Sequence, residues 1–178
     1  MRKVEMDGEI YYENKGKFLN SSFIEVDLET KTKLAKKVLG SIDFKKLEIY
    51  DLLQFAKDTK ESEQYGLCRE VCEFGLSKFD SDESFVKSIL PVLTSTYRSL
   101  NNPQEAIRVA EIQRKKCRCD SIALFTSLAA AYCDVKNYEM AKKYADVAYA
   151  KQGGGTGHEN ELSLVYKRIK KELGDKYV

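Results

Sequence analysis

Residues 127–153, SLAAAYCDVKNYEMAKKYADVAYAKQG, decide the fold because their alanines and tyrosines recur elsewhere in the chain at regular intervals. Tyr132 lies 35 residues after Tyr97, and Ala141 lies 35 residues after Ala106. Intervals of 34 or 35 residues separate four further pairs: Ala110 and Ala145, Leu93 and Leu128, Leu128 and Leu162, and Tyr132 and Tyr166. A period of this length is typical of an array of helix–turn–helix units.

Helical periodicity extends outward from this stretch over the chain from Asp27 onward. A first short helix is expected to end at Gly40, because glycine suits the position that follows a helix C-terminus. Asn102 and Pro103 form a start signal, since asparagine caps a helix and proline fits its first position. The remaining helices are predicted within 43–60 and at 64–79, 84–100, 103–117, 121–135, 138–151 and 158–173.

Residues 1–27 have a different pattern, in which tyrosine, phenylalanine, isoleucine and valine favour strands. Asp7-Gly8 is a two-residue turn signal, and a second turn falls at 14–17. We predict a small β-hairpin or three-stranded meander that docks on the helices behind it, because an isolated hairpin is only marginally stable. The domain boundary is therefore placed between residues 27 and 28, with a helical domain over 28–178.

The helical units resemble the tetratricopeptide repeat (TPR) family in the order of their large and small residues. The best unit supplies Phe125, Leu128, Ala129, Tyr132, Tyr138, Ala141, Tyr144 or Ala145, and Ala148. The unit before it supplies Leu90, Leu93, Thr94, Tyr97 and Ala106, and a weaker first unit supplies Leu52, Phe55, Ala56, Tyr65, Cys68, Cys72 and Gly75. The resemblance covers about residues 47–173. It implies a mostly α-helical, right-handed superhelix of antiparallel helix pairs, closed by a capping helix at about 158–174.

Length, charge and apolar content restrict the class of protein. A chain of 178 residues allows one sizeable core, and a net charge of +2 argues against binding polyanions through bulk charge. The N-terminal segment is charged throughout, and no run reaches the roughly 18 apolar residues that span a bilayer. We therefore expect a cytoplasmic protein without membrane contact. An odd number of cysteines, five, argues against a disulfide framework.

The residues that carry catalysis or bind metals in other proteins are scarce in this chain. Cys68 and Cys72 lie four residues apart, where the repeat calls for small buried groups, so we interpret them as core residues. Cys117 and Cys119 could be a redox pair or half of a metal site, and their reactivity stays open. His158 is the single histidine and has no motif around it. We expect neither an enzyme nor a bound metal or cofactor.

Two basic runs, 114–118 and 167–171, support an alternative hypothesis. In that hypothesis the protein is a nucleic-acid-associated regulator whose lysines and arginines contact phosphates. The competing interpretation is that cations near a helix C-terminus complement the helix dipole and stay solvated. No aromatic residue interleaves either run, so we favour the second interpretation.

The resemblance also implies where a partner would bind, because the first helices of successive units line a concave groove in this family. The groove residues it implies in this sequence are Tyr50, Leu53, Lys57, Lys60, Ser88, Ser95, Arg98, Thr126, Ala130, Cys133, Asp134, Asn160 and Lys167. Pro91, Ala123 and Leu164 would lie beside them. We expect a non-enzymatic scaffold or adaptor that holds a protein or peptide segment there, with acidic residues as the complement to the cations. Self-association through the hairpin or the last helix is a further expectation.

Close packing at small residues gives the first prediction. Replacing Ala141 by leucine should overpack the contact between two helices and lower the free energy of unfolding by roughly 1–3 kcal/mol. Chemical denaturation of both proteins measures the difference. A leucine variant as stable as the wild type would contradict the nested packing.

Overall fold

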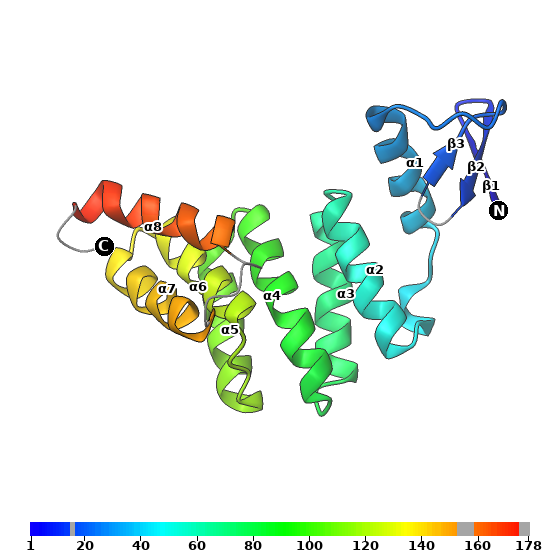
Figure 1. Cartoon of the computed structure of the whole chain (residues 1–178). Helices are drawn as coiled ribbons and strands as arrows, with labels where there is room; N and C mark the ends of the chain where they lie inside the picture. Colours follow the sequence, from blue (N-terminus) through cyan, green and yellow to red (C-terminus); the bar gives the residue numbers. More distant parts are fainter. Residues whose placement is uncertain (15–16, 153–158, 175–178) are drawn as a thin grey trace.

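The computed structural model describes residues 1–14, 17–152 and 159–174, and these are mostly helical with a small antiparallel sheet at the N-terminus (Figure 1). The strands are β1 (Arg2–Met6), β2 (Glu9–Asn14) and β3 (Lys17–Leu19). The helices are α1 (Leu28–Gly40), α2 (Ile49–Glu61), α3 (Tyr65–Lys78), α4 (Glu83–Ser99), α5 (Pro103–Cys117), α6 (Ile122–Asp134), α7 (Tyr138–Gln152) and α8 (Glu159–Leu173), with a short 3-10 helix at Phe44–Lys46.

Polar side chains define the starts of the helices in the array. The Asn102 side chain accepts a hydrogen bond from the backbone N–H of Glu105, and Ser121 accepts one from Leu124 in the same way. Each contact satisfies one of the N–H groups that a helix leaves unpaired at its N-terminus. Asp82 caps α4, so Pro91 lies inside this helix, where its ring removes one backbone hydrogen bond.

The N-terminal sheet has the order β1-β2-β3 and packs against α1 alone rather than against the whole array. Val4, Tyr11 and Phe18 from the sheet and Leu34 from α1 form a hydrophobic cluster separate from the main core. Figure 1 shows this unit at one end of the molecule. Helix α1 thus packs against the sheet through Leu34, while its Leu39 belongs to the main core of the array.

The open edge of this sheet is partly covered. In a two-residue hairpin the residues flanking the turn form a hydrogen-bonded pair, which leaves Lys3 and Glu5 of β1 with their backbone groups directed outward. The Lys37 ammonium of α1 donates a hydrogen bond to the Glu5 carbonyl at 2.5 Å. One of the outward acceptors of β1 is thereby satisfied within the chain.

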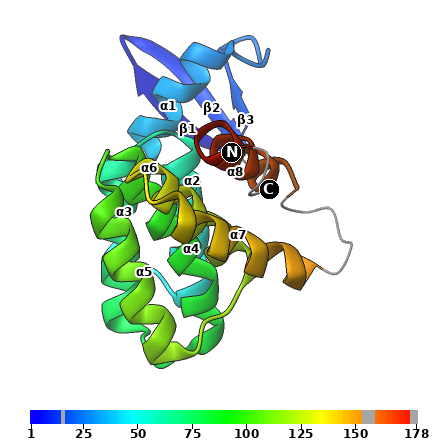
Figure 2. The same ribbon diagram turned by 90° about the vertical axis from the view of Figure 1, so that its left-hand side faces the viewer.

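From α2 onward the helices form a continuous array in which each helix contacts the next. The even-numbered helices also contact one another in order, α2 with α4, α4 with α6, and α6 with α8. Figure 2 shows α3 and α5 together on one side of the array and α8 on the opposite side. The even-numbered helices therefore form one layer, and α3 and α5 belong to the other.

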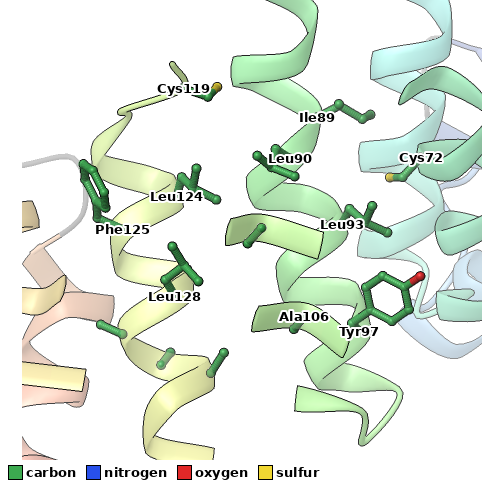
Figure 3. Close-up of a cluster of buried hydrophobic side chains, with 14 of the residues drawn as sticks. Cys72, Ile89, Leu90, Leu93, Tyr97, Ala106, Cys119, Leu124, Phe125 and Leu128 are labelled. Atoms are coloured by element: carbon green, nitrogen blue, oxygen red, sulfur yellow. The ribbon is translucent and has the colours of Figure 1, made fainter. Parts of the chain in front are cut away.

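The core of the array is built from large side chains on the first helices and alanines at the contacts between helices. Leu124 and Leu128 of α6 point toward Leu90 of α4, as Figure 3 shows. Eight alanines are completely buried: Ala56, Ala106, Ala110, Ala129, Ala131, Ala141, Ala145 and Ala148. Because small side chains allow close approach, these alanines bring neighbouring helices into direct contact.

A tyrosine hydroxyl links the two layers of the array at regular intervals. The Tyr97 hydroxyl of α4 donates to Glu73 of α3, and the Tyr166 hydroxyl of α8 donates to Asp146 of α7 at 2.8 Å. Between these positions, burial and the Glu111 carboxylate of α5 raise the pKa of Tyr132 in α6. Two of the recurring tyrosines, Tyr97 and Tyr166, thus each bond a carboxylate on the helix before their own, whereas Glu111 accepts its hydrogen bond from Tyr144 of α7.

Two glycines of α3 give a matched test of the packing. A Cβ atom at Gly75 would lie 2.7 Å from the buried Phe85 ring, whereas a Cβ at Gly66 would meet nothing within 4 Å. Gly75→Ala should therefore destabilise the fold by about 1–2 kcal/mol through overpacking. Gly66→Ala should stabilise it by about 0.5 kcal/mol, because alanine favours a helix over glycine. Thermal melts of the two variants report both values, and equal shifts would contradict the close contact at Gly75.

Candidate functional site

The layer of even-numbered helices carries a groove with a volume of about 640 Å³. This volume falls within the range of ligand-binding clefts, about 300–1,000 Å³. Helices α2, α4, α6 and α8 all contribute to it. The residues that line the groove are Lys60, Pro91, Val92, Ser95, Arg98, Ala123, Thr126, Ser127, Ala130, Glu161, Leu164, Val165, Lys167, Arg168 and Lys171.

The floor of the groove belongs to α6 and consists of small side chains. Ala123, Thr126, Ser127 and Ala130 follow one another at helical spacing and so share one face of α6. Pro91 and Val92 line the α4 side, and Leu164 and Val165 line the α8 side. The groove therefore has an apolar centre, with the hydroxyl groups of its floor as polar contacts.

The Thr126 hydroxyl stands out among the polar groups of the floor. Thr126 is 1% exposed, and its Oγ1 atom has no hydrogen-bond partner. Thr94 and Thr96 of α4 are also buried, but their hydroxyls donate to backbone carbonyls one turn back in the helix. A buried polar atom without a partner is unfavourable, so the fold itself leaves the hydrogen-bonding capacity of the Thr126 hydroxyl unused.

A shared carboxylate holds two arginines at one end of the groove. Arg98 Nε of α4 lies 2.6 Å from Asp134 Oδ2 of α6, and an Arg168 terminal nitrogen of α8 lies 2.8 Å from Asp134 Oδ1. Three helices are thus joined at Asp134. The two arginines share a single carboxylate, so this cluster keeps one net positive charge.

Lysines add further positive charge around the same end. Lys60 of α2 and both Lys167 and Lys171 of α8 line the groove, and none of the ion pairs found among the described residues involves them. Among the described residues that line the groove, Glu161 is the one acidic side chain. Three lysines without an ion pair among the described residues and two arginines that share Asp134 give this part of the groove an excess of positive charge that attracts acidic groups.

Several residues implied by the sequence resemblance come together here. Lys60, Ser95, Arg98, Thr126, Ala130 and Lys167 line the groove, as do Pro91, Ala123 and Leu164. Asp134 lies in the adjoining pocket, which shares Arg98 and Arg168 with the groove. The part that each of these residues plays in binding stays a prediction.

Other implied residues lie elsewhere. Tyr50, Leu53, Lys57 and Ser88 do not line the groove, and Cys133 is buried. The side chain of Asn160 lies outside the described residues. Six lining residues were not named from the sequence: Val92, Ser127, Glu161, Val165, Arg168 and Lys171. Helical spacing from the named residues would have indicated several of them, since Ser127, Arg168 and Lys171 each follow a named residue by four positions.

The basic run 114–118 makes contacts within the protein. Arg114 pairs with Glu111 and Asp120 and lies 5.8 Å from the centre of the Phe125 ring. Lys116 pairs with Asp80 at 2.7 Å. Both side chains join neighbouring parts of the array. For this run, a structural role is therefore favoured over the phosphate contacts of the nucleic-acid hypothesis. In the second run, Lys167, Arg168 and Lys171 line the groove.

The five cysteines are free and buried. Cys68 Sγ lies 3.2 Å from the Ala56 carbonyl oxygen, and burial raises the pKa of the Cys119 thiol to about 11. Among the described residues, no group of three or more histidines, cysteines or carboxylates is placed to hold a metal ion. Within the same residues no helix is long and apolar enough to cross a membrane.

Comparison of the chain with protein-family models and with curated proteins gave no match.

The burial of Cys119 predicts slow thiol chemistry in the folded protein. A rise of the pKa from 9.0 to about 11 lowers the thiolate fraction at pH 8 about a hundredfold. Alkylation of Cys119 at pH 8, followed by peptide mass spectrometry, should be at least that much slower without urea than in urea. The same shift should lower stability as the pH rises from 9 to 11, because the unfolded thiol loses its proton first. Equal labelling rates in the two conditions would contradict the burial of this thiol.

Proposed function

We propose that this protein is a non-enzymatic interaction module whose helical array is a TPR-like right-handed superhelix and whose groove holds a segment of another protein. The groove lined by four helices is the observation that carries the proposal. It combines an apolar centre, an unpartnered hydroxyl and an excess of cations. Such a surface favours a peptide that carries apolar and acidic side chains.

The packing of the array supports the repeat part of the proposal. In stacked repeats each unit contacts its neighbours, and the first helices of successive units lie beside one another. The contacts of α2 with α4, α4 with α6, and α6 with α8 follow this order. The tyrosine–carboxylate contacts at Tyr97 and Tyr166 recur between equivalent helices, as a repeat predicts.

Binding is favoured over catalysis by the chemistry of the groove. Among the described residues, its lining includes no histidine and no cysteine, the residues that most often activate a nucleophile or transfer a proton. Within the same residues, Glu161 is the one lining carboxylate, and the rest of its wall is apolar or basic. The cations and hydroxyls of the groove suit the recognition of a polypeptide.

Filling the groove tests the proposal. Ala123 lines the groove on α6, whereas Ala150 is exposed on α7, so Ala123→Phe and Ala150→Phe form a matched pair. Proteins retained from native lysate by the wild type should be retained equally by Ala150→Phe and lost with Ala123→Phe. Quantitative mass spectrometry of the eluates measures retention, and circular dichroism checks that both variants fold. Retention of the same proteins by folded Ala123→Phe would refute binding in the groove.

A further inference from the structure

The floor of the groove has the form of a helix-packing face. Its four residues, Ala123, Thr126, Ser127 and Ala130, occupy positions i, i+3, i+4 and i+7 of α6. Small residues at this spacing allow the backbone of a second helix to approach closely. Ala129, Ala141 and Ala148 bring α6 and α7 together in this way within the protein. The stripe on the floor repeats that arrangement on the side of α6 that faces the groove.

The walls of the groove run alongside this stripe. Helices α4 and α6 point in the same direction, since Leu90 faces Leu124 in the upper part of Figure 3 and Arg98 pairs with Asp134 near the C-terminal ends of both helices. Helix α8 is antiparallel to α7, because Tyr166 bonds Asp146 and Glu172 lies near Tyr138 at the start of α7. It therefore points the same way as α6. The lining residues span Pro91 to Arg98 on α4 and Glu161 to Lys171 on α8, about two to three helical turns. The groove is therefore elongated in the direction of α6.

Charge along the groove is distributed unevenly. All the lining cations lie toward the C-terminal ends of their helices: Lys60 on α2, Arg98 on α4, and Lys167, Arg168 and Lys171 on α8. The Arg98–Asp134–Arg168 cluster fixes these ends next to one another. Glu161 lies at the opposite end, near the start of α8. A bound segment that complements the charge of the groove therefore carries its acidic side chains at one end only.

The Thr126 hydroxyl provides an independent indication that the floor is occupied in a complex. It lies in the middle of the stripe, is 1% exposed and has no partner within the described residues. This atom is already covered in the free protein, so a bound helix would give it a polar partner by displacing the side chains around it. Serine and threonine hydroxyls bond across close helix contacts in membrane proteins.

We propose that the segment held in the groove is an amphipathic α-helix of another protein, which lies along α6 between α4 and α8. Its inner face carries small apolar residues with one polar side chain opposite Thr126. Its acidic residues lie at the end next to Lys60, Lys167 and Lys171. This inference rests on the proposed function and specifies the conformation and chemistry of the bound segment. Helices that bind in apolar grooves contact them through anchor side chains at the same i, i+3, i+4, i+7 spacing.

Photo-cross-linking from two positions on α8 tests the conformation. Leu164 and Lys171 both line the groove and are exposed, and they lie seven residues apart, or about 10.5 Å along a helix. Benzoylphenylalanine at each position in the full-length protein, irradiated in native lysate, marks the residues of the partner that lie opposite. We expect the two marked residues to lie about seven apart in one partner segment, with acidic residues near the one marked from position 171.

The spacing of the marks separates the outcomes. Marks about three residues apart would indicate an extended strand, at about 3.3 Å per residue, and would overturn the helix while leaving the proposed function intact. Marks that join two copies of this chain, or that fall on nucleic acid, would overturn it as well. Absence of any cross-link from both positions would overturn the proposed function together with the inference.

A conservative variant tests the role of the Thr126 hydroxyl. Thr126→Val keeps the shape of the side chain and should leave the thermal stability of the free protein equal or higher, since it removes an unpartnered polar atom. Affinity for a synthetic peptide of the mapped segment should fall about tenfold, as measured by fluorescence anisotropy. Thr94→Val is the control, because the Thr94 hydroxyl donates to the Leu90 carbonyl within the core. Unchanged affinity of Thr126→Val would overturn the contact of the bound helix with this part of the floor.

Discussion

Close approach of helices at alanine is the constraint on which the rest of the structure depends. Ala106, Ala110, Ala129, Ala141, Ala145 and Ala148 have no exposed surface, and each lies where a larger side chain would separate two helices. Because these contacts recur at a fixed interval, successive helices stack in a regular order. The tyrosines between them fill the remaining space, and two of them direct their hydroxyls at carboxylates on the preceding helix.

The same regularity creates the groove. Since the even-numbered helices lie beside one another, residues that are equivalent within the units come together on one surface. Arg98, Asp134 and Arg168 lie about one repeat apart in sequence, yet they form a single ion cluster across three helices. The position of the groove is thus a consequence of the stacking, and its chemistry depends on which residues each unit has at these positions.

Much of the fold could be predicted from the sequence. The mostly helical fold with a small N-terminal sheet is confirmed, because caps such as Asn102 and the 35-residue interval are local signals. The docking of the sheet on a helix was expected, because a lone hairpin is marginally stable, but the separate cluster around Leu34 depends on tertiary contacts. For the groove, the sequence named Arg98 and Thr126, which line the cavity, and also Tyr50, Lys57 and Ser88, which do not. Which face of a helix lines a cavity depends on crossing angles, and sequence spacing does not determine these.

The hydrogen bond from Lys37 to the Glu5 carbonyl has a consequence for the behaviour of the protein at high concentration. An uncovered strand edge can recruit strands from other molecules and so start polymerisation. The Lys37 ammonium occupies one of the acceptors of β1 that such a strand would need. An added strand would first have to displace this cation, so the contact opposes edge-to-edge association of two copies of the chain.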